Sequence, residues 1–311
     1  MSQFELIEAT KSGNLEEIEK YLNEGRDINR KDEKGYSSLH WACENGLFEV
    51  VTYLLNHGAL VNIHDMSGET PLLKACKNGF FKIVEQLVER GANLNIQGVN
   101  GETPLLTTCA RGFLEITNFL VQAGADVSIQ EDWGKTPLHR ACAYGEPTAV
   151  SLLLDRGADY NRQSLVGDTP LHEATRFGRT RVVLILLQRG AIVDLPNRKG
   201  ETPLHVASRL SRYNSIYLLL MHGANLNLLD YQNLTAVEIS EKRSERDCTD
   251  LIKVFIHYNK HRKNWLHFVN HITRFQEGNI DHHKHISTLQ INFPQTFKVI
   301  NIPELSRFVT E

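Results

Sequence analysis

Residues 68–100 read GETPLLKACKNGFFKIVEQLVERGANLNIQGVN, and this stretch carries the start and stop signals of two short helices. Thr70 followed by Pro71 predicts a helix start, because a threonine hydroxyl caps free N–H groups and proline suits the first helical position. Gly79 ends that helix, since glycine adopts the left-handed conformation at low cost. Apolar residues recur at helical spacing over 83–88 and predict a second helix directly after the first.

The same pattern returns every 33 residues along most of the chain. After the second helix, residues 93–101 are polar and glycine-rich, which predicts an extended β-turn finger leading to the next helix pair. One such pair cannot bury both of its faces alone, whereas stacking neighbouring pairs buries them. Two glycine series mark the period: Gly35, Gly68, Gly101, Gly134, Gly167 and Gly200, and then Gly25, Gly58, Gly91, Gly124, Gly157, Gly190 and Gly223.

The segments that open the repeats read GYSSLHWAC, GETPLLKAC, GETPLLTTC, GKTPLHRAC, GDTPLHEAT and GETPLHVAS. In this Gly-x-Thr-Pro-Leu-His-x-Ala pattern the chain resembles the ankyrin repeat family, with six clear repeats and two weaker flanking ones. The resemblance implies an all-α repeat solenoid of helix-turn-helix units joined by β-turn fingers. It covers residues 1–265 in about eight units, with the first and last as caps. Residues 266–311 remain as a C-terminal capping or tail segment.

The composition argues against several classes of protein. The 311 residues include 34 basic and 37 acidic side chains, for a formal net charge of −3, so the whole chain has no pull toward nucleic acid or anionic membrane. No apolar run approaches the roughly 18 residues that a membrane span requires, and the acidic start is unlike a signal peptide. We therefore expect a monomer in the cytoplasm, with the nucleus as the other option, that binds neither nucleic acid nor membrane.

Cysteines and histidines recur in the repeats, and we interpret them as structural residues. One cysteine per repeat stands at Cys43, Cys76, Cys109 and Cys142. Stacked helices lie about 8–10 Å apart, too far for disulfides between them. The histidines of the Thr-Pro-Leu-His element are His40, His139, His172 and His205, and the resemblance implies that they bond to neighbouring turns. No catalytic motif accompanies them, so the sequence predicts no catalytic residue, no metal site and no cofactor.

The C-terminal region differs from the repeats. His257 and His261, like His267 and His271, have the i,i+4 spacing of a helical zinc site, but no Cys or Glu stands in ligand register. Apolar residues over 265–275 share a helical face, and alternation begins at Leu289, which predicts a short helix and then an extended tail. This segment either covers the end of the solenoid, docks a separate protein or folds into the groove as an autoinhibitory element.

The resemblance implies a partner-binding groove formed by the first helices and the finger tips. At the variable positions of the first helices this chain has a strip of cations interrupted by aromatic residues: Trp41, Lys74, Lys77, Arg111, Arg140, Tyr144, Arg176, Phe177 and Arg209. The cations outnumber Glu44 and Glu173, which predicts attraction of an acidic partner. Aromatic residues and arginines are also typical of binding hot spots. An ordinary solvated helix face is the alternative reading.

The finger tips give a second candidate surface. Met66, Trp133 and Tyr231 are apolar or aromatic at tip positions, as are Leu165 and Val166. Exposed tips are usually polar, so either neighbouring fingers pack on one another or these side chains contact a partner.

Together these features predict a non-enzymatic scaffold or adaptor. It would bind a partner protein with an acidic and apolar contact surface through the concave groove and the finger tips. The alternative is an ankyrin targeting module of a regulatory or host-directed effector protein, with an activity or a second binding site in the C-terminal tail. The 46 residues of that tail make a small enzyme core at best.

Overall fold

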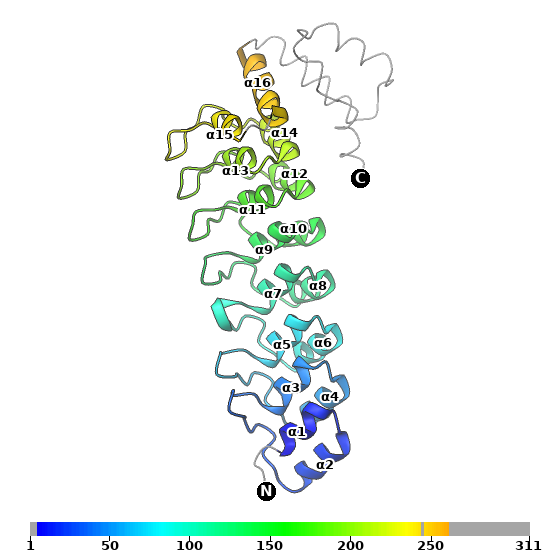
Figure 1. Cartoon of the computed structure of the whole chain (residues 1–311). Helices are drawn as coiled ribbons and strands as arrows, with labels where there is room; N and C mark the ends of the chain where they lie inside the picture. The colour runs from blue at the N-terminus through cyan, green and yellow to red at the C-terminus, as the bar shows by residue number, and fades with distance from the viewer. Residues whose placement is uncertain (1–4, 244–245, 261–311) are drawn as a thin grey trace. The chain divides into compact units, whose positions relative to one another are not determined.

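The computed structural model describes residues 5–243 and 246–260 of the chain (Figure 1). The chain divides into two compact units, Met1–Ala236 and Val237–Glu311. Over the described residues the secondary structure is helical, with no strand, which confirms the predicted all-α class. The predicted domain boundary at residue 265 and the segment 266–311 lie outside the described residues.

The first unit is a stack of helix pairs, each joined to the next by a finger (Figure 1). Odd-numbered helices pack on one another along the stack, and even-numbered helices do the same, so the pairs form two columns. The bounds are α1 Glu5–Ser12, α2 Leu15–Asn23, α3 Ser38–Glu44, α4 Phe48–Asn56, α5 Pro71–Asn78, α6 Phe81–Glu89, α7 Pro104–Arg111, α8 Leu114–Gln122, α9 Pro137–Tyr144, α10 Pro147–Asp155, α11 Pro170–Arg176, α12 Thr180–Gln188, α13 Pro203–Arg209 and α14 Tyr213–Met221. This is the predicted helix-turn-helix solenoid.

The first helix of each clear repeat begins at a hydroxyl cap, as helix α5 illustrates. The backbone N–H of Leu73 donates to Thr70 Oγ1 over 3.3 Å, and Pro71 is the first helical residue. Gly79 ends α5 in the left-handed conformation with a φ of 76°. A cap of this kind contributes about 1 kcal/mol to helix stability. Both ends of the helix therefore agree with the local signals in the sequence.

The core runs along the stack between the two columns of helices. Leu72 and Cys76 of α5 are fully buried, as are Val84 and Leu87 of α6. Burying a leucine side chain contributes about 1.5–3 kcal/mol. Because each repeat places apolar residues at the same positions, each added helix pair extends the core by a similar amount.

A side-chain carboxylate or amide holds most fingers in a tight turn. In the finger before α5, Asp65 Oδ1 accepts hydrogen bonds from the N–H groups of Ser67 and Glu69, at 2.8 and 2.9 Å. The equivalent residues that accept in the same way are Asp32, Asn197 and Asp230. The finger before α7 has Gly98 at this position and forms a 3₁₀ turn instead, η1 (Val99–Gly101).

Backbone hydrogen bonds join neighbouring fingers near their tips. The N–H of Leu165 donates to the carbonyl of Trp133 over 2.9 Å, and the N–H of Arg198 donates to the carbonyl of Val166 over 3.0 Å. This close approach explains the first glycine series. A Cβ on Gly167 would lie 2.6 Å from the backbone nitrogen of Arg198.

The second unit continues the helical pattern. Helix α15 (Ala236–Lys242) begins at the boundary between the units, 33 residues after the start of α13, and α16 (Arg246–Lys260) follows it. The Ser240 and Thr249 hydroxyls are 2.8 Å apart, and Lys253 pairs with Glu241 at 2.7 Å. Across the described part of the chain, no helix combines the length and the apolar character needed to cross a membrane.

Candidate functional site

The first helices present an exposed side chain at the same point of the repeat, where the helix ends. In three consecutive repeats this position holds Arg111, Tyr144 and Phe177, at the ends of α7, α9 and α11. Tyr144 is 46% exposed and Phe177 48% exposed, and Arg111 is also exposed. The ring of Tyr144 lies over Gly112, where a Cβ would come within 2.1 Å of the ring. Because these helices pack side by side, the three residues form one exposed row.

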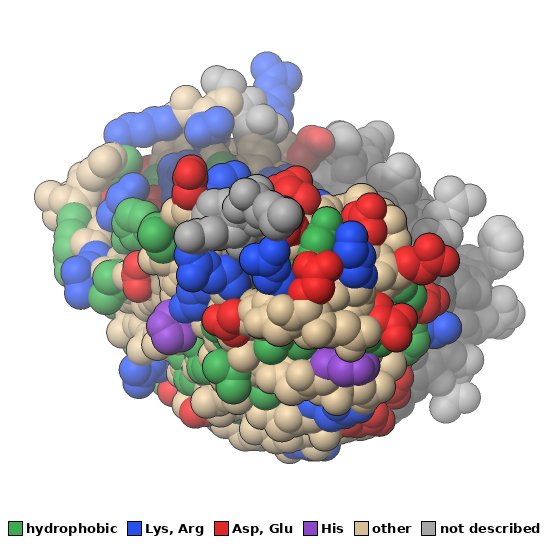
Figure 2. Space-filling model, turned by 90° about the horizontal axis from the view of Figure 1, so that it is seen from below, with side chains coloured by type: hydrophobic (Ala, Val, Ile, Leu, Met, Phe, Trp, Pro, Cys, Tyr) green, Lys and Arg blue, Asp and Glu red, His purple; other side chains and the backbone are tan. Residues whose placement is uncertain are grey.

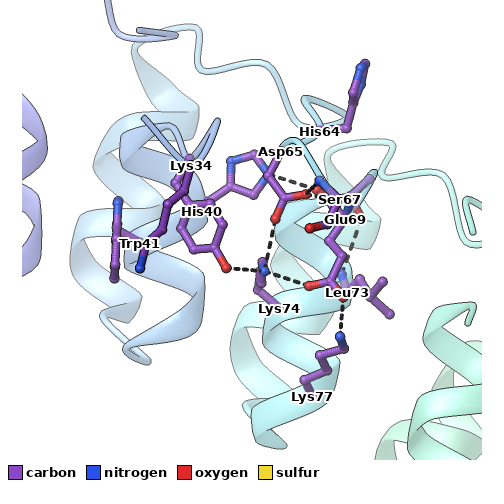
Figure 3. Close-up of polar contacts among 12 residues, drawn as sticks. Lys34, His40, Trp41, His64, Asp65, Ser67, Glu69, Leu73, Lys74 and Lys77 are labelled. Carbon is purple, nitrogen blue, oxygen red and sulfur yellow. Dashed lines mark hydrogen bonds and ion pairs between the residues drawn. The ribbon is translucent and has the colours of Figure 1, made fainter. Parts of the chain in front are cut away.

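Lys74 lies inside the stack, in a network of buried charges (Figure 3). Its side chain is 6% exposed, and Nζ is 2.6 Å from Glu69 Oε2 and 3.0 Å from Asp65 Oδ2. Nζ also donates to the hydroxyl of Tyr36. Burial opposes the charge, but the hydrogen bonds to Glu69, Tyr36 and Asp65 outweigh it and raise the pKa of Lys74 above its ordinary value. Lys74, expected in the exposed strip, is instead held within the fold by two buried carboxylates.

Four other cations of the predicted strip are each paired with an acidic side chain of their own finger. The pairs are Lys77 with Glu69, Arg140 with Glu131 at 3.1 Å, Arg176 with Asp168, and Arg209 with Glu201 at 2.9 Å. The cationic side chains remain 25–34% exposed, whereas their acidic partners are buried. The strip therefore lacks the excess of positive charge that its own residues suggest. Arg111 is different, because no residue in the described ranges forms an ion pair with it.

Sequence reasoning misses the acidic partners because they stand in the fingers rather than in the helices. Glu69, Asp168 and Glu201 each precede their cation by eight residues. The recurrence of an acidic residue eight positions before a cation in three repeats is the sequence pattern that indicates these ion pairs. A count of charges at the helix positions alone omits the finger carboxylates and overstates the positive charge of the strip.

Trp41 occupies the repeat position that Lys74 and Arg140 occupy further along. Its Nε1–H donates to Asp32 Oδ2 over 2.9 Å, and the ammonium group of Lys11 lies 4.5 Å from the centre of its ring. The indole is thus partly covered by the first repeat. It does not continue the exposed row of aromatic residues.

The finger tips carry strongly exposed apolar side chains. Met66 is 79% exposed, Trp133 63% and Tyr231 77%. Seen along the stack from its N-terminal end, hydrophobic and basic side chains lie together on the edge formed by the fingers (Figure 2). Neighbouring fingers are joined by backbone hydrogen bonds, and parts of the Met66 and Tyr231 side chains lie against a glycine of the preceding finger. Most of each of these two side chains nevertheless remains exposed.

Comparisons with known proteins agree with this geometry. A family model described as ankyrin repeats in three copies matches residues 6–98, 91–164 and 162–230, well over half of the chain. The chain belongs to the ankyrin repeat family. Among solved structures it is similar to the human ASB11 ankyrin repeat domain, with 30% sequence identity and a TM-score of 0.62 over 70% of this chain and 97% of that one. No curated protein matches the chain significantly.

In this ankyrin stack the histidines of the first helices bridge successive repeats. His139 Nδ1 accepts a hydrogen bond from the N–H of Thr136 at 3.2 Å, and Nε2 lies 3.0 Å from the carbonyl oxygen of Asp168. A carbonyl only accepts, so the proton is on Nε2 and the ring is neutral. Burial lowers the pKa of His139 to about 4. His40 and His172 are arranged in the same way. His205 accepts from its own cap as well, but its Nε2 lies 3.1 Å from a carbonyl oxygen earlier in the next finger, that of Leu228.

The cysteines of the ankyrin repeats are likewise internal. All five cysteines are free thiols and are buried. Burial raises the pKa of the Cys109 thiol to about 12, which disfavours the reactive thiolate. No group of three or more potential metal ligands gathers within the described ranges. The histidines after residue 260 lie outside those ranges, and the absence of a metal site there stays a prediction.

Proposed function

We propose that this ankyrin repeat protein is a non-enzymatic scaffold or adaptor that binds a partner protein through the exposed row and the finger tips. Ankyrin repeats are in general a protein-interaction module. The observation that carries the proposal is the exposed row of Arg111, Tyr144 and Phe177. Side chains of these types dominate binding hot spots, and here they stand on three neighbouring helices whose other side chains are largely buried or internally paired.

The proposal places the protein in a reducing compartment, the cytoplasm or the nucleus, as a monomer. The five free cysteines support a reducing compartment, because disulfides form and persist in oxidising compartments such as the extracellular space. The alternative function, an activity in residues 266–311, rests on residues outside the described ranges. No contact in the described part of the chain favours it over the scaffold.

The test compares two matched triple variants of the intact chain. Affinity capture from cell extract identifies the retained protein, and binding of that purified protein is then measured. Arg111→Ala/Tyr144→Ala/Phe177→Ala should weaken binding by about 30-fold or more, because losing one hot spot alone costs about 2 kcal/mol.

The control changes exposed residues of the second helices in the same three repeats, Glu115→Ala/Thr148→Ala/Arg181→Ala. It should bind within twofold of the unmodified chain. Equal binding by the row variant, or a greater loss in the control, would place the site elsewhere. Far-UV circular dichroism checks that both variants keep their helices.

A further inference from the structure

In the C-terminal half of the first unit, three of four successive finger tips carry exposed apolar side chains. Trp133 is 63% exposed, Leu165 51%, Val166 53% and Tyr231 77%. The backbone bonds between fingers place these residues beside one another, since Leu165 donates to the carbonyl of Trp133. Tyr231 in turn donates to the carbonyl of Lys199 over 3.0 Å. We call this set of tips, from Trp133 to Tyr231, the tip surface.

The tip surface also carries positive charge that the fold does not neutralise. Arg162, Arg198 and Lys199 are exposed on these fingers. Arg162 donates to the neutral amide oxygen of Gln130 over 2.6 Å. Neither Arg198 nor Lys199 has an ion-pair partner among residues 5–243 and 246–260. Asp132 is exposed at these tips, and Asp159 is exposed in the same finger as Arg162.

This charge pattern is the reverse of that on the first helices. There, Arg140, Arg176 and Arg209 are each matched by a buried carboxylate. When the first helices of this half are compared with its fingers, the cations without an ion-pair partner in the described residues therefore lie on the fingers. Oppositely charged groups approaching from solution are attracted to such a surface and gain in both speed and specificity of binding.

An open hollow lies between the last fingers of the tip surface. Its lining includes Arg162, Leu165, Pro196, Arg198 and Tyr231, together with neighbouring polar residues and a glycine. Its walls combine two guanidinium groups with an aromatic ring and aliphatic side chains. A carboxylate and an apolar side chain from the same ligand therefore find their counterparts within one hollow.

We propose that the tip surface binds an acidic, extended polypeptide segment that also carries an aromatic or aliphatic side chain. This inference rests on the proposed function and names the partner chemistry of one part of the binding surface. Four fingers stacked about 8–10 Å apart span roughly 25–30 Å. That span matches about eight extended residues at ~3.3 Å per residue.

The N-terminal fingers offer a matched control. Lys34 and Met66 are the repeat equivalents of Lys199 and Tyr231, and Met66 donates to the carbonyl of Lys34 over 3.3 Å in the same way. Met66 is as exposed as Tyr231. The neighbouring tip residues, however, are Glu33 and Ser67, which supply neither added positive charge nor apolar area.

The experiment selects binders from random twelve-residue peptides displayed on phage, using the full chain as bait. Enriched sequences should be rich in Asp and Glu and contain an aromatic or aliphatic residue. Fluorescein-labelled copies are then titrated by anisotropy. Lys199→Glu/Tyr231→Ser should weaken peptide binding at least tenfold. The control variant, Lys34→Glu/Met66→Ser, should bind within twofold of the unmodified chain. Added salt should weaken peptide binding to the unmodified chain, because salt screens the attraction between opposite charges.

Four results would overturn the proposal. Enrichment of neutral or basic peptides would show that the ligand is not acidic. Equal loss of binding in both double variants would show that the site is not on the tip surface. Failure to enrich any peptide would contradict both parts of the proposal. Peptides that bind Lys199→Glu/Tyr231→Ser normally but do not bind Tyr144→Ser would place the site on the exposed row. The scaffold function would then still hold, and the proposal for the tip surface would be wrong.

Discussion

At the residue scale, the histidine of the Thr-Pro-Leu-His element has a structural role that its geometry explains. His139 accepts from its own helix cap on one ring nitrogen and donates to the following repeat from the other. The bond accepted at Nδ1 requires the neutral ring, because protonation of that nitrogen would remove its lone pair. Burial lowers the pKa of His139 to about 4. The same ring thus couples helix capping to the joining of repeats.

This geometry predicts how acid affects folding. Between pH 6.5 and about 4 the unfolded chain protonates the imidazole of His139 while the native state keeps it neutral. Stability is therefore full above pH 6.5 and falls as the pH drops through this window, by up to about 1.4 kcal/mol per pH unit. His139→Leu should cost about 1–2 kcal/mol at pH 7.5, and its unfolding free energy should depend less on pH below 6.5.

Urea denaturation at several values of pH measures both effects. The exposed His64 provides the comparison, as His64→Leu. A His139→Leu curve that runs parallel to that of the unmodified chain from pH 6.5 to 4.5 would contradict the assignment of a neutral ring.

At the element scale, the fingers determine how closely repeats approach. Gly167 has a φ of 80° and no room for a Cβ, because the backbone of Arg198 lies against it. Gly157, in the second glycine series, has a φ of 81°, but a Cβ there would meet nothing within 4 Å. Gly167 is therefore needed both for its left-handed backbone conformation and because a side chain would clash with the next finger. Gly157 is needed for its backbone conformation alone.

The two glycines can be separated by the same substitution. Gly157→Ala should cost about 1 kcal/mol, the strain of a left-handed alanine. Gly167→Ala should cost at least about 1 kcal/mol more, since its methyl group pushes the neighbouring finger away. Equilibrium urea denaturation gives both free energies, and equal costs would show that finger contact is unimportant.

Elements differ in how far the sequence predicts them. The ends of α5 follow from Thr70, Pro71 and Gly79, because capping is decided by residues within a turn of one another. The burial of Lys74 does not follow, because it depends on where the finger places Asp65 and Glu69. The sequence predicts the residues of the exposed row from their positions in the repeat. It does not predict the net charge of the strip, because that charge depends on ion pairs between finger carboxylates and helix cations, which only the three-dimensional structure shows.

At the scale of the whole molecule, the bridging histidines are unevenly distributed. His139, His172 and His205 bridge three successive junctions in the C-terminal half of the first unit. In the second and third repeats Leu73 and Leu106 stand at this position, and a leucine forms no such bond. The stack is therefore expected to be held together more firmly toward its C-terminal half.

Hydrogen exchange followed by mass spectrometry tests this expectation. Amides of α11 should be protected by about 1–2 kcal/mol more than those of α5 and α7, the contribution of one or two additional hydrogen bonds. The double variant His139→Leu/His172→Leu should remove most of that difference. Equal or greater protection of α5 and α7 in the unmodified chain would refute the uneven distribution of stability.

The bond between Leu165 and Trp133 joins residues 32 positions apart, and so does the bond between Arg198 and Val166. Duplication of a complete 33-residue unit preserves every such spacing, whereas inserting one or two residues into a finger breaks the bonds on both sides of it. Descendants of this protein can accordingly gain or lose length in whole units far more readily than in fragments. The size of its binding face should change in steps during evolution, while the geometry of each step stays the same.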